Sequence, residues 1–168
     1  RTIKQALLEL KAEGRLDRVK ALILTNSTFD GHMANVAQTM EECLAIKPDL
    51  AFLWDEAWSA FARFTPFLRW RTAMSGAAHL RANRDNPKYR QRYQEFVARG
   101  IAIDISDPRA LDERIMPDPD QMRVRVYQTT SVHKSMSALR QASLISIADD
   151  DFADVEEAFH EAYFTHTS

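Results

Sequence analysis

Two short apolar runs, separated by one segment of helical periodicity, constrain the fold of this chain more than any other feature. The runs cover residues 19–24 and 50–54, and polar residues end each of them. Between them, at residues 33–44, apolar side chains recur at the spacing of an amphipathic helix. Apolar runs of this length fit buried parallel strands. A strand, a helix and a strand in this order predict a βαβ unit.

The remainder of the chain continues the alternation of strands and helices. The further elements that we expect are a helix, two strands and a closing helix, at residues 3–13, 122–127, 142–147 and 152–163. This order predicts the α/β class, with a mainly parallel sheet flanked by helices. In such sheets ligands bind at the carboxyl ends of the strands, so polar residues that follow a predicted strand are the candidates for a site.

The middle of the chain departs from this simple pattern. Residues 61–71 are rich in aromatic side chains and arginine, and residues 72–99 are helical in pattern with a break near Asn86-Pro87. The following residues, 101–119, are rich in Asp and Pro and predict a loop with one weak strand at 101–105. We interpret residues 66–121 as an enlarged connection between two strands.

Composition narrows the class of protein. At 168 residues the chain is long enough for one domain, and its net charge of −2 provides no basic field for nucleic acid. The single cysteine, Cys43, allows no internal disulfide, which suits a cytoplasmic protein, and its helical spacing predicts a buried side chain. No apolar run is long enough to cross a bilayer. Because the chain begins at Arg1, we expect it to be a fragment.

The first candidate site is the segment Thr130-Ser131-Val132-His133-Lys134-Ser135, which follows a predicted strand. A lysine that attacks a carbonyl must be neutral, and burial among other cations favours the neutral amine. His133 can move protons, and the hydroxyls of Ser131 and Ser135 can bind a phosphate at a turn. Taken alone, the segment is equally typical of a polar loop.

A second candidate, Asp55-Glu56-Ala57-Trp58, follows the predicted strand at residues 50–54. An acidic side chain at this position can pair with a protonated ring nitrogen, and Ala57 is small enough for a flat ring to lie against it. An apolar run followed by Asp-Glu is also typical of a nucleotidase strand. That alternative needs a phosphate-binding GxxxxGK[ST] loop, and the chain contains none.

A third polar segment, residues 25–31, directly follows the first predicted strand. Its hydroxyl and amide side chains can orient a substrate or cofactor. They can equally cap the helix that follows, which is the better interpretation for any one of them.

Taken together, the three segments resemble the major domain of the bacterial ornithine/lysine/arginine decarboxylases, a family of fold-type-I enzymes that use pyridoxal phosphate (PLP). The segment after Lys134, through Ser143, and the last seven residues are also similar to that family. The resemblance covers most of the chain in matching order. It implies a partial PLP-binding major domain over residues 1–168, without the upstream phosphate loop and without the C-terminal domain.

The resemblance also implies roles for individual residues. Lys134 would attach to the cofactor aldehyde, Asp55 would hold the pyridine nitrogen, and Ala57 would pack on one face of the ring. Ser131 and His133 would lie near the phosphate and the reacting carbon, and Trp58 would line the pocket. The implied reaction converts a basic α-amino acid (lysine, ornithine or arginine) to an amine and CO2, in a homodimer that requires no metal, and the fragment itself is expected to be inactive.

One departure from the family leaves alternatives open. Lys134 and Asp55 are farther apart in the sequence than in the best-known members, because of the connection at residues 66–121. Another fold-type-I enzyme, such as an aminotransferase or an aldolase, would keep both residues but lose the match around Ser131-Val132-His133. A non-catalytic relative is a further possibility, although such a protein has no need of either residue.

Overall fold

A computed structural model describes residues 2–100, 106–107 and 111–166 as an α/β fold. Its sheet has four strands in the order β1-β2-β3-β4. Strands β1 and β2 pair in parallel, as do β2 and β3, whereas β4 runs antiparallel to β3. The predicted mainly parallel sheet is therefore confirmed. The four strands span Ala21–Thr25, Ala51–Asp55, Arg125–Ser131 and Ser143–Asp149.

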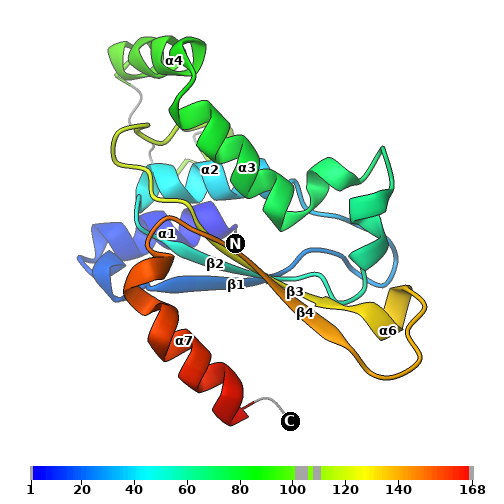
Figure 1. Ribbon diagram of the computed structural model, residues 1–168. Helices are drawn as coiled ribbons and strands as arrows, with labels where there is room; N and C mark the ends of the chain where they lie inside the picture. Colours follow the sequence, from blue (N-terminus) through cyan, green and yellow to red (C-terminus); the bar gives the residue numbers. More distant parts are fainter. Residues whose placement is uncertain (1, 101–105, 108–110, 167–168) are drawn as a thin grey trace.

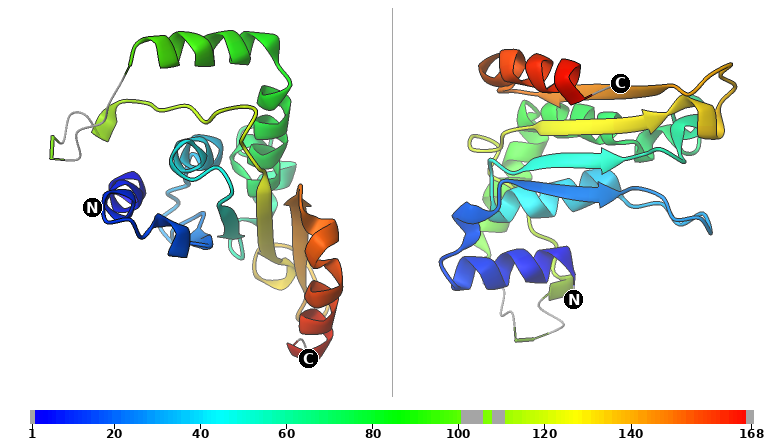
Figure 2. Two further views of the ribbon diagram at one scale, coloured as in Figure 1. Left: turned by 90° about the vertical axis from the view of Figure 1, so that its left-hand side faces the viewer. Right: turned by 90° about the horizontal axis from the view of Figure 1, so that it is seen from below.

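Helices cover the two faces of this sheet unequally (Figures 1 and 2). Helices α1, α2 and α3 lie on one side, α7 lies on the other, and α4 projects away from the sheet. The helices α1, α2, α3, α4, α6 and α7 span Ile3–Ala12, Val36–Ile46, Ala73–Arg84, Pro87–Ala98, Val132–Ser135 and Phe152–His166. Within the described part of the chain, none of them has the length and apolarity that a membrane crossing needs.

The core lies between α2, α3 and one face of the sheet. Alternation along β2 buries Phe52 and Trp54 on this face, where they join α2 residues such as Met40 in one apolar cluster. Helix α3 crosses α2 at Gly76, where an added Cβ would meet the Met40 Cε at 2.7 Å. Cys43 is buried in the same cluster, as predicted, and burial raises the pKa of its thiol to about 12, with a smaller contribution from Glu42.

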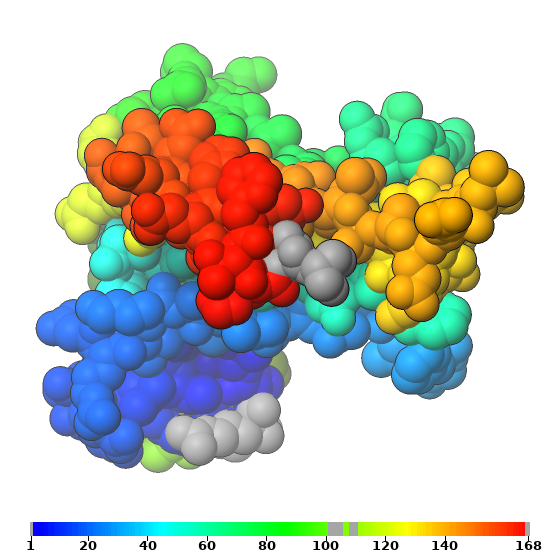
Figure 3. Space-filling model, turned by 60° about the horizontal axis from the view of Figure 1, so that its bottom comes forward, coloured from blue at the N-terminus to red at the C-terminus, as the bar shows by residue number. Residues whose placement is uncertain are grey.

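The opposite face of the sheet is only partly covered. Helix α7 packs there through Phe159, whose ring centroid lies 6.3 Å from that of Tyr127. Figure 3 shows α7 lying across this face, with the connection between β3 and β4 extending beyond it. Strand β1 is one of the two edge strands, and its Ile23 side chain is 74% exposed. The prediction of a buried first strand is thus wrong among the described residues, since only the face toward α2 and α3 is covered.

Most element boundaries agree with the sequence, and two features differ from the prediction. The helical break at Asn86-Pro87 separates α3 from α4, as expected. Strand β3 begins at Arg125 and runs to Ser131, so the expected strand at residues 122–127 is displaced towards the carboxyl end. The cap of α2 is Asn35, whose side chain accepts from the Gln38 amide, and no residue of the 25–31 segment caps it. The weak strand expected at residues 101–105 lies outside the described residues.

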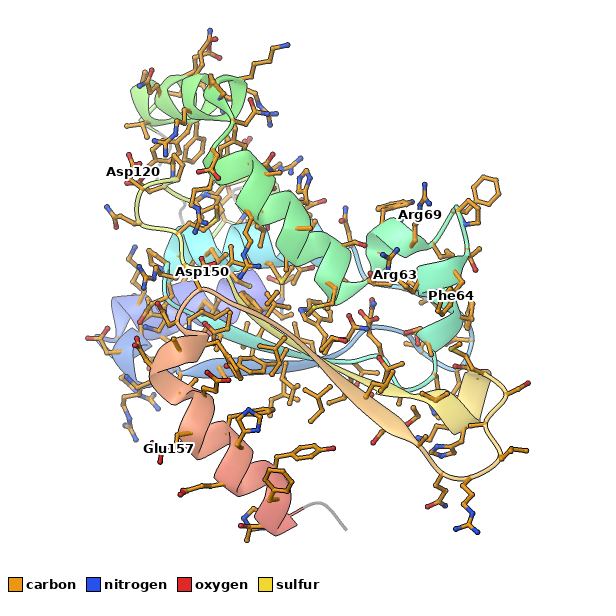
Figure 4. All side chains as sticks on the ribbon, viewed as in Figure 1. Arg63, Phe64, Arg69, Asp120, Asp150 and Glu157 are labelled. Carbon is orange, nitrogen blue, oxygen red and sulfur yellow. The ribbon has the colours of Figure 1, made fainter. Side chains whose placement is uncertain are left out.

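Asp150, in the turn between β4 and α7, ties helix α3 to the sheet (Figure 4). Its carboxylate accepts hydrogen bonds from Arg81 Nε at 3.0 Å, from an Arg84 guanidinium nitrogen at 2.7 Å, and from the Val124 amide at 2.9 Å. Burial alone would raise the pKa of Asp150, but the hydrogen bonds from Val124, Arg84 and Arg81 outweigh burial and lower that pKa. The charged carboxylate therefore stabilises the folded chain.

We expect Asp150→Asn to lower the free energy of unfolding at pH 7 by about 2 kcal/mol, because charge-assisted hydrogen bonds to two arginines weaken. The folded-state pKa lies below its unfolded value, so this contribution is present above about pH 4 and is lost on further acidification. Urea unfolding at pH 7 and pH 3 measures it. Asp120→Asn, which removes an exposed partner of Arg90, is the control and should cost below about 1 kcal/mol. Equal losses in the two variants would contradict the anchoring role.

Candidate functional site

The three polar segments singled out in the sequence meet at the carboxyl ends of the parallel strands. Asp55, the last residue of β2, lies in register with Thr25 of β1 and Thr129 of β3. Beyond the ladder, the Asn26 amide donates to the Asp55 carbonyl at 3.0 Å, and the Glu56 amide donates to the Thr129 carbonyl at 2.8 Å. The chain ends of all three strands are therefore fixed relative to one another by backbone hydrogen bonds.

Trp58 contacts the other two segments with its ring. The Phe29 ring, from the segment after β1, stands edge-on to it with 5.3 Å between centroids. The Lys134 Nζ, from the turn after β3, lies 5.5 Å from the Trp58 ring centroid, within the range of a cation–π contact. Lys134 and Asp55 thus lie at the same edge of the sheet, with Trp58 three residues after Asp55.

Asp55 is held by a local turn. Its Oδ1 accepts a hydrogen bond from the Ala57 amide at 2.9 Å, and the residue is only partly exposed. Because side chains alternate along a strand, Asp55 belongs to the same face of β2 as Leu53 and is opposite Trp54. The turn orients the carboxylate, and this position leaves it accessible at the strand end.

Lys134 and its neighbours occupy the single helical turn α6, between β3 and β4. Lys134 and His133 are both exposed, so the burial that the sequence analysis expected for the lysine is wrong for the described chain. The reason is topological, since α6 lies on a connection that extends past the edge of the sheet (Figures 1 and 3). His133 Nδ1 lies 3.1 Å from the Ala142 carbonyl oxygen and 3.3 Å from its amide nitrogen.

The two serines of this segment differ in their surroundings. Ser131 ends β3 and pairs with Ser143 of β4. The Ser135 hydroxyl is buried and has no hydrogen-bond partner among the described residues. A buried hydroxyl without a partner costs free energy. The Ser135 hydroxyl could therefore form a hydrogen bond that the described residues do not supply.

Glu56 is a buried carboxyl group to which the sequence analysis gave no role. It is 1% exposed, and its Oε1 accepts hydrogen bonds from Asn26 Nδ2 at 2.9 Å and from the Ala73 amide at 2.6 Å. These contacts join the end of β1, the end of β2 and the first turn of α3. Burial raises the pKa of Glu56, although the Ala73 and Asn26 hydrogen bonds act in the opposite direction.

Asn26 was also missed as an individual residue within the 25–31 segment. Its Nδ2 donates to the Arg71 carbonyl at 2.9 Å as well as to Glu56, and the residue is 2% exposed. One sequence signal predicts this pair. Alternation places Glu56 on the same face as the buried Trp54, and a buried carboxylate requires polar partners at a neighbouring strand end.

The described residues contain no cluster of three or more His, Cys, Asp or Glu side chains placed to hold a metal ion. What the arrangement offers instead is a primary amine, an oriented carboxylate and an aromatic ring at one edge, together with the unpartnered Ser135 hydroxyl. These groups suit an organic ligand that carries a carbonyl and a basic nitrogen.

Comparisons with known proteins match the chain to one family. A family model described as "Orn/Lys/Arg decarboxylase, major domain" matches residues 1–86. The constitutive lysine decarboxylase of Escherichia coli K12 is 28% identical over 149 residues, which cover 87% of this chain and 14% of that protein. A lysine decarboxylase of Pseudomonas aeruginosa is 28% identical over 94% of this chain and 15% of its own length. The lysine decarboxylase of Hafnia alvei is 27% identical over 87% of this chain and 13% of its own length.

The chain therefore spans only about a seventh of the length of these curated relatives. No solved structure matches it.

The Glu56 contacts generate a prediction about stability. We expect Glu56→Ala to lower the free energy of unfolding by about 2–4 kcal/mol, because the Asn26 amide group and the Ala73 N–H lose a buried acceptor. Glu56→Gln keeps an acceptor oxygen and removes a charge that burial disfavours, so it should stay within about 1 kcal/mol of the wild type.

The pH dependence of the free energy of unfolding separates the contribution of the Glu56 charge from that of its hydrogen bonds. A raised folded-state pKa means that the Glu56 contribution is fully present below its unfolded pKa and is lost as pH rises through the folded value. Glu56→Gln should therefore gain stability relative to the wild type between about pH 4 and pH 8 in urea unfolding. A constant difference across that range would show that burial does not disfavour the Glu56 charge.

Proposed function

Because the chain belongs to the family of the Orn/Lys/Arg decarboxylase major domain, we propose that it forms part of a PLP-dependent enzyme that decarboxylates a basic amino acid. The names of the relatives favour lysine as the substrate. The reaction is proposed for the protein to which these residues contribute, since they cover about a seventh of each relative's length.

The observation that carries this proposal is the shared edge of Lys134 and Asp55. Lys134 Nζ lies over the ring of Trp58, and Trp58 follows Asp55 by three residues in the same turn. A cofactor held covalently by an amine and electrostatically by a carboxylate requires both groups near one another, and the position of both at the carboxyl-end edge of the sheet supports this assignment. The exposed position of Lys134 is the feature that fits this role least well.

The residues present fit PLP in their donor set. Asp55 would pair with the protonated ring nitrogen, and Lys134 would hold the aldehyde carbon. Ala57 would lie against one ring face, and the hydroxyls of Ser131 and Ser135 would bind on the phosphate side with His133 nearby. When bound, PLP supplies an electron sink for the charge left at Cα after loss of CO2.

The residues of this chain then have three tasks. Asp55, oriented by the Ala57 amide, keeps a proton on the ring nitrogen, which an opposite charge favours. Trp58 provides an aromatic wall beside the amine of Lys134. His133 or Lys134 returns a proton to Cα as a general acid. Because Lys134 is exposed, water can reach the site of this proton transfer. We therefore expect the chain of 168 residues, tested by itself, to show no decarboxylase turnover.

The first test concerns Lys134. We expect the chain incubated with PLP and reduced with borohydride to carry the cofactor on Lys134, detected by peptide mass mapping, and Lys134→Arg to abolish that modification because a guanidinium does not condense with the aldehyde. Lys134→Arg keeps the positive charge beside Trp58 and so preserves the local contact. Lys88→Arg, on exposed helix α4, is the matched control. Equal labelling of Lys134 and Lys88 at low cofactor concentration would refute the assignment.

A second test concerns Asp55. We expect Asp55→Asn to weaken PLP binding about tenfold, because an amide cannot neutralise a protonated ring nitrogen. The titration follows the visible absorption of the bound cofactor in the wild type and the variant. Asp49→Asn, at a carboxylate that pairs with Lys47 before β2, is the control and should leave affinity unchanged. Unaltered affinity in Asp55→Asn would remove Asp55 from the cofactor site.

A further inference from the structure

A cavity of about 590 Å³ lies next to Trp58, on the side of the segment that follows β1. Its walls come from residues 27–33 and from the turns at residues 58–71, and neither Asp55 nor Lys134 lines it. The lining includes the apolar side chains of Phe29, Met33, Phe61 and Leu68. The cavity is therefore a neighbour of the proposed cofactor site and shares one wall with it, the ring of Trp58.

One buried polar group at the wall of this cavity has no partner. Ser59 lines the cavity and is 1% exposed, and its hydroxyl makes no hydrogen bond with any described residue. A buried hydroxyl without a partner costs free energy that a hydrogen-bonding ligand would recover. Its position is fixed by the backbone, because the Ser59 amide donates to the Glu56 carbonyl at 3.1 Å.

The permanent positive charge in the cavity comes from Arg71, while the other ionisable lining residue, His32, lies 3.5 Å from the Asp30 carboxylate. One guanidinium nitrogen donates weakly to the Met33 and Ala34 carbonyls, at 3.3 and 3.5 Å, and the group lies 4.4 Å from the Trp70 ring centroid. Within the described residues no carboxylate lies within ion-pairing distance of Arg71, and no Asp or Glu side chain lines the cavity. A half-buried guanidinium that contacts only neutral groups favours an anion, and its planar fork matches a carboxylate.

We propose that this cavity binds a small molecule that carries one carboxylate on an apolar body. The carboxylate accepts from Arg71 and from the Ser59 hydroxyl, which rotates about its Cα–Cβ bond to reach the ligand, and the apolar body packs against Phe29, Trp58 and Phe61. No acidic side chain lines the cavity to pair with an ammonium group; the nearby Asp30 carboxylate lies 3.5 Å from Nε2 of the lining residue His32. The site shares the Trp58 ring with the proposed cofactor site, but its polar contacts to Arg71 and Ser59 do not involve Asp55 or Lys134, so the two proposals can be tested separately.

A carboxylate of this kind has two sources. It is either the α-carboxylate of the amino-acid substrate, whose remaining atoms extend past Trp58 toward Lys134, or that of a separate molecule. Isothermal titration of the chain with benzoate, benzamide and L-lysine distinguishes them. Benzoate tests the shared chemistry, benzamide is the neutral molecule of the same shape, and L-lysine tests the substrate.

We expect saturable binding of benzoate at least tenfold tighter than that of benzamide, since the charged group adds hydrogen bonds to Arg71. Arg71→Gln should remove this difference, Arg71→Lys should retain part of it, and Ser59→Ala should weaken benzoate about fivefold. Arg69→Gln is the matched control, because Arg69 is exposed, does not line the cavity and projects from the surface (Figure 4). It should change affinity less than twofold.

L-lysine binding that depends on Arg71 identifies the substrate as the source, whereas binding of benzoate alone identifies a separate ligand. The proposal is overturned if benzoate does not saturate, if benzamide binds equally well, or if Arg71→Gln binds benzoate like the wild type. Circular dichroism tests whether each variant folds. If Arg71→Gln does not fold, the affinities of Arg71→Lys and Ser59→Ala for benzoate decide the outcome. The cofactor-labelling experiment on Lys134 is separate, so either proposal can fail without the other.

Discussion

The buried carboxyl group of Glu56 is the contact on which the arrangement of the strand ends depends. It receives hydrogen bonds from Asn26, beyond β1, and from the first turn of α3, while its own backbone amide binds β3. Three elements that are distant in the sequence are thereby held at one point behind the sheet edge. Asp55 precedes this point and Trp58 follows it, so both side chains project from a turn whose interior is fixed. A site at this edge gains rigidity from a residue that never touches its ligand.

The strands, the main helices and the class of fold could be predicted because each rests on local periodicity. The βαβ pattern and the break at Asn86-Pro87 both follow from residues close in sequence. The coverage of β1 could not be predicted in this way, since an apolar run signals the capacity for burial and not the presence of a covering helix. Likewise Asn35, and not the 25–31 segment, caps α2, because several polar residues between a strand and a helix compete for one position.

The candidate site was predictable at the level of segments and not of contacts. Parallel strands bring their carboxyl ends together, so residues 25–31, 55–58 and 130–135 were expected to share an edge, and they do. The exposure of Lys134 was not predictable, since it depends on how far the connection between β3 and β4 extends. Arg71 and Ser59 went unnoticed because their significance lies in missing partners, which a sequence cannot reveal. Glu56 was also missed, although its burial could have been predicted, since alternation along β2 places it on the same face as the buried Trp54.

Strand β1 has a consequence for the behaviour of the chain in solution. It pairs with β2 along one side only, it is short, and its outward Ile23 side chain is exposed. The backbone N–H and C=O groups on its other side offer a template for strand addition, and nothing charged lies along residues 21–25 to oppose it. Another polypeptide that supplies a fifth strand would continue the hydrogen-bonded ladder. Without such a strand, we expect two copies of the chain to associate through the free edge of β1 as the protein concentration rises. The colloidal stability of the chain then depends on whether another strand covers Ala21–Thr25.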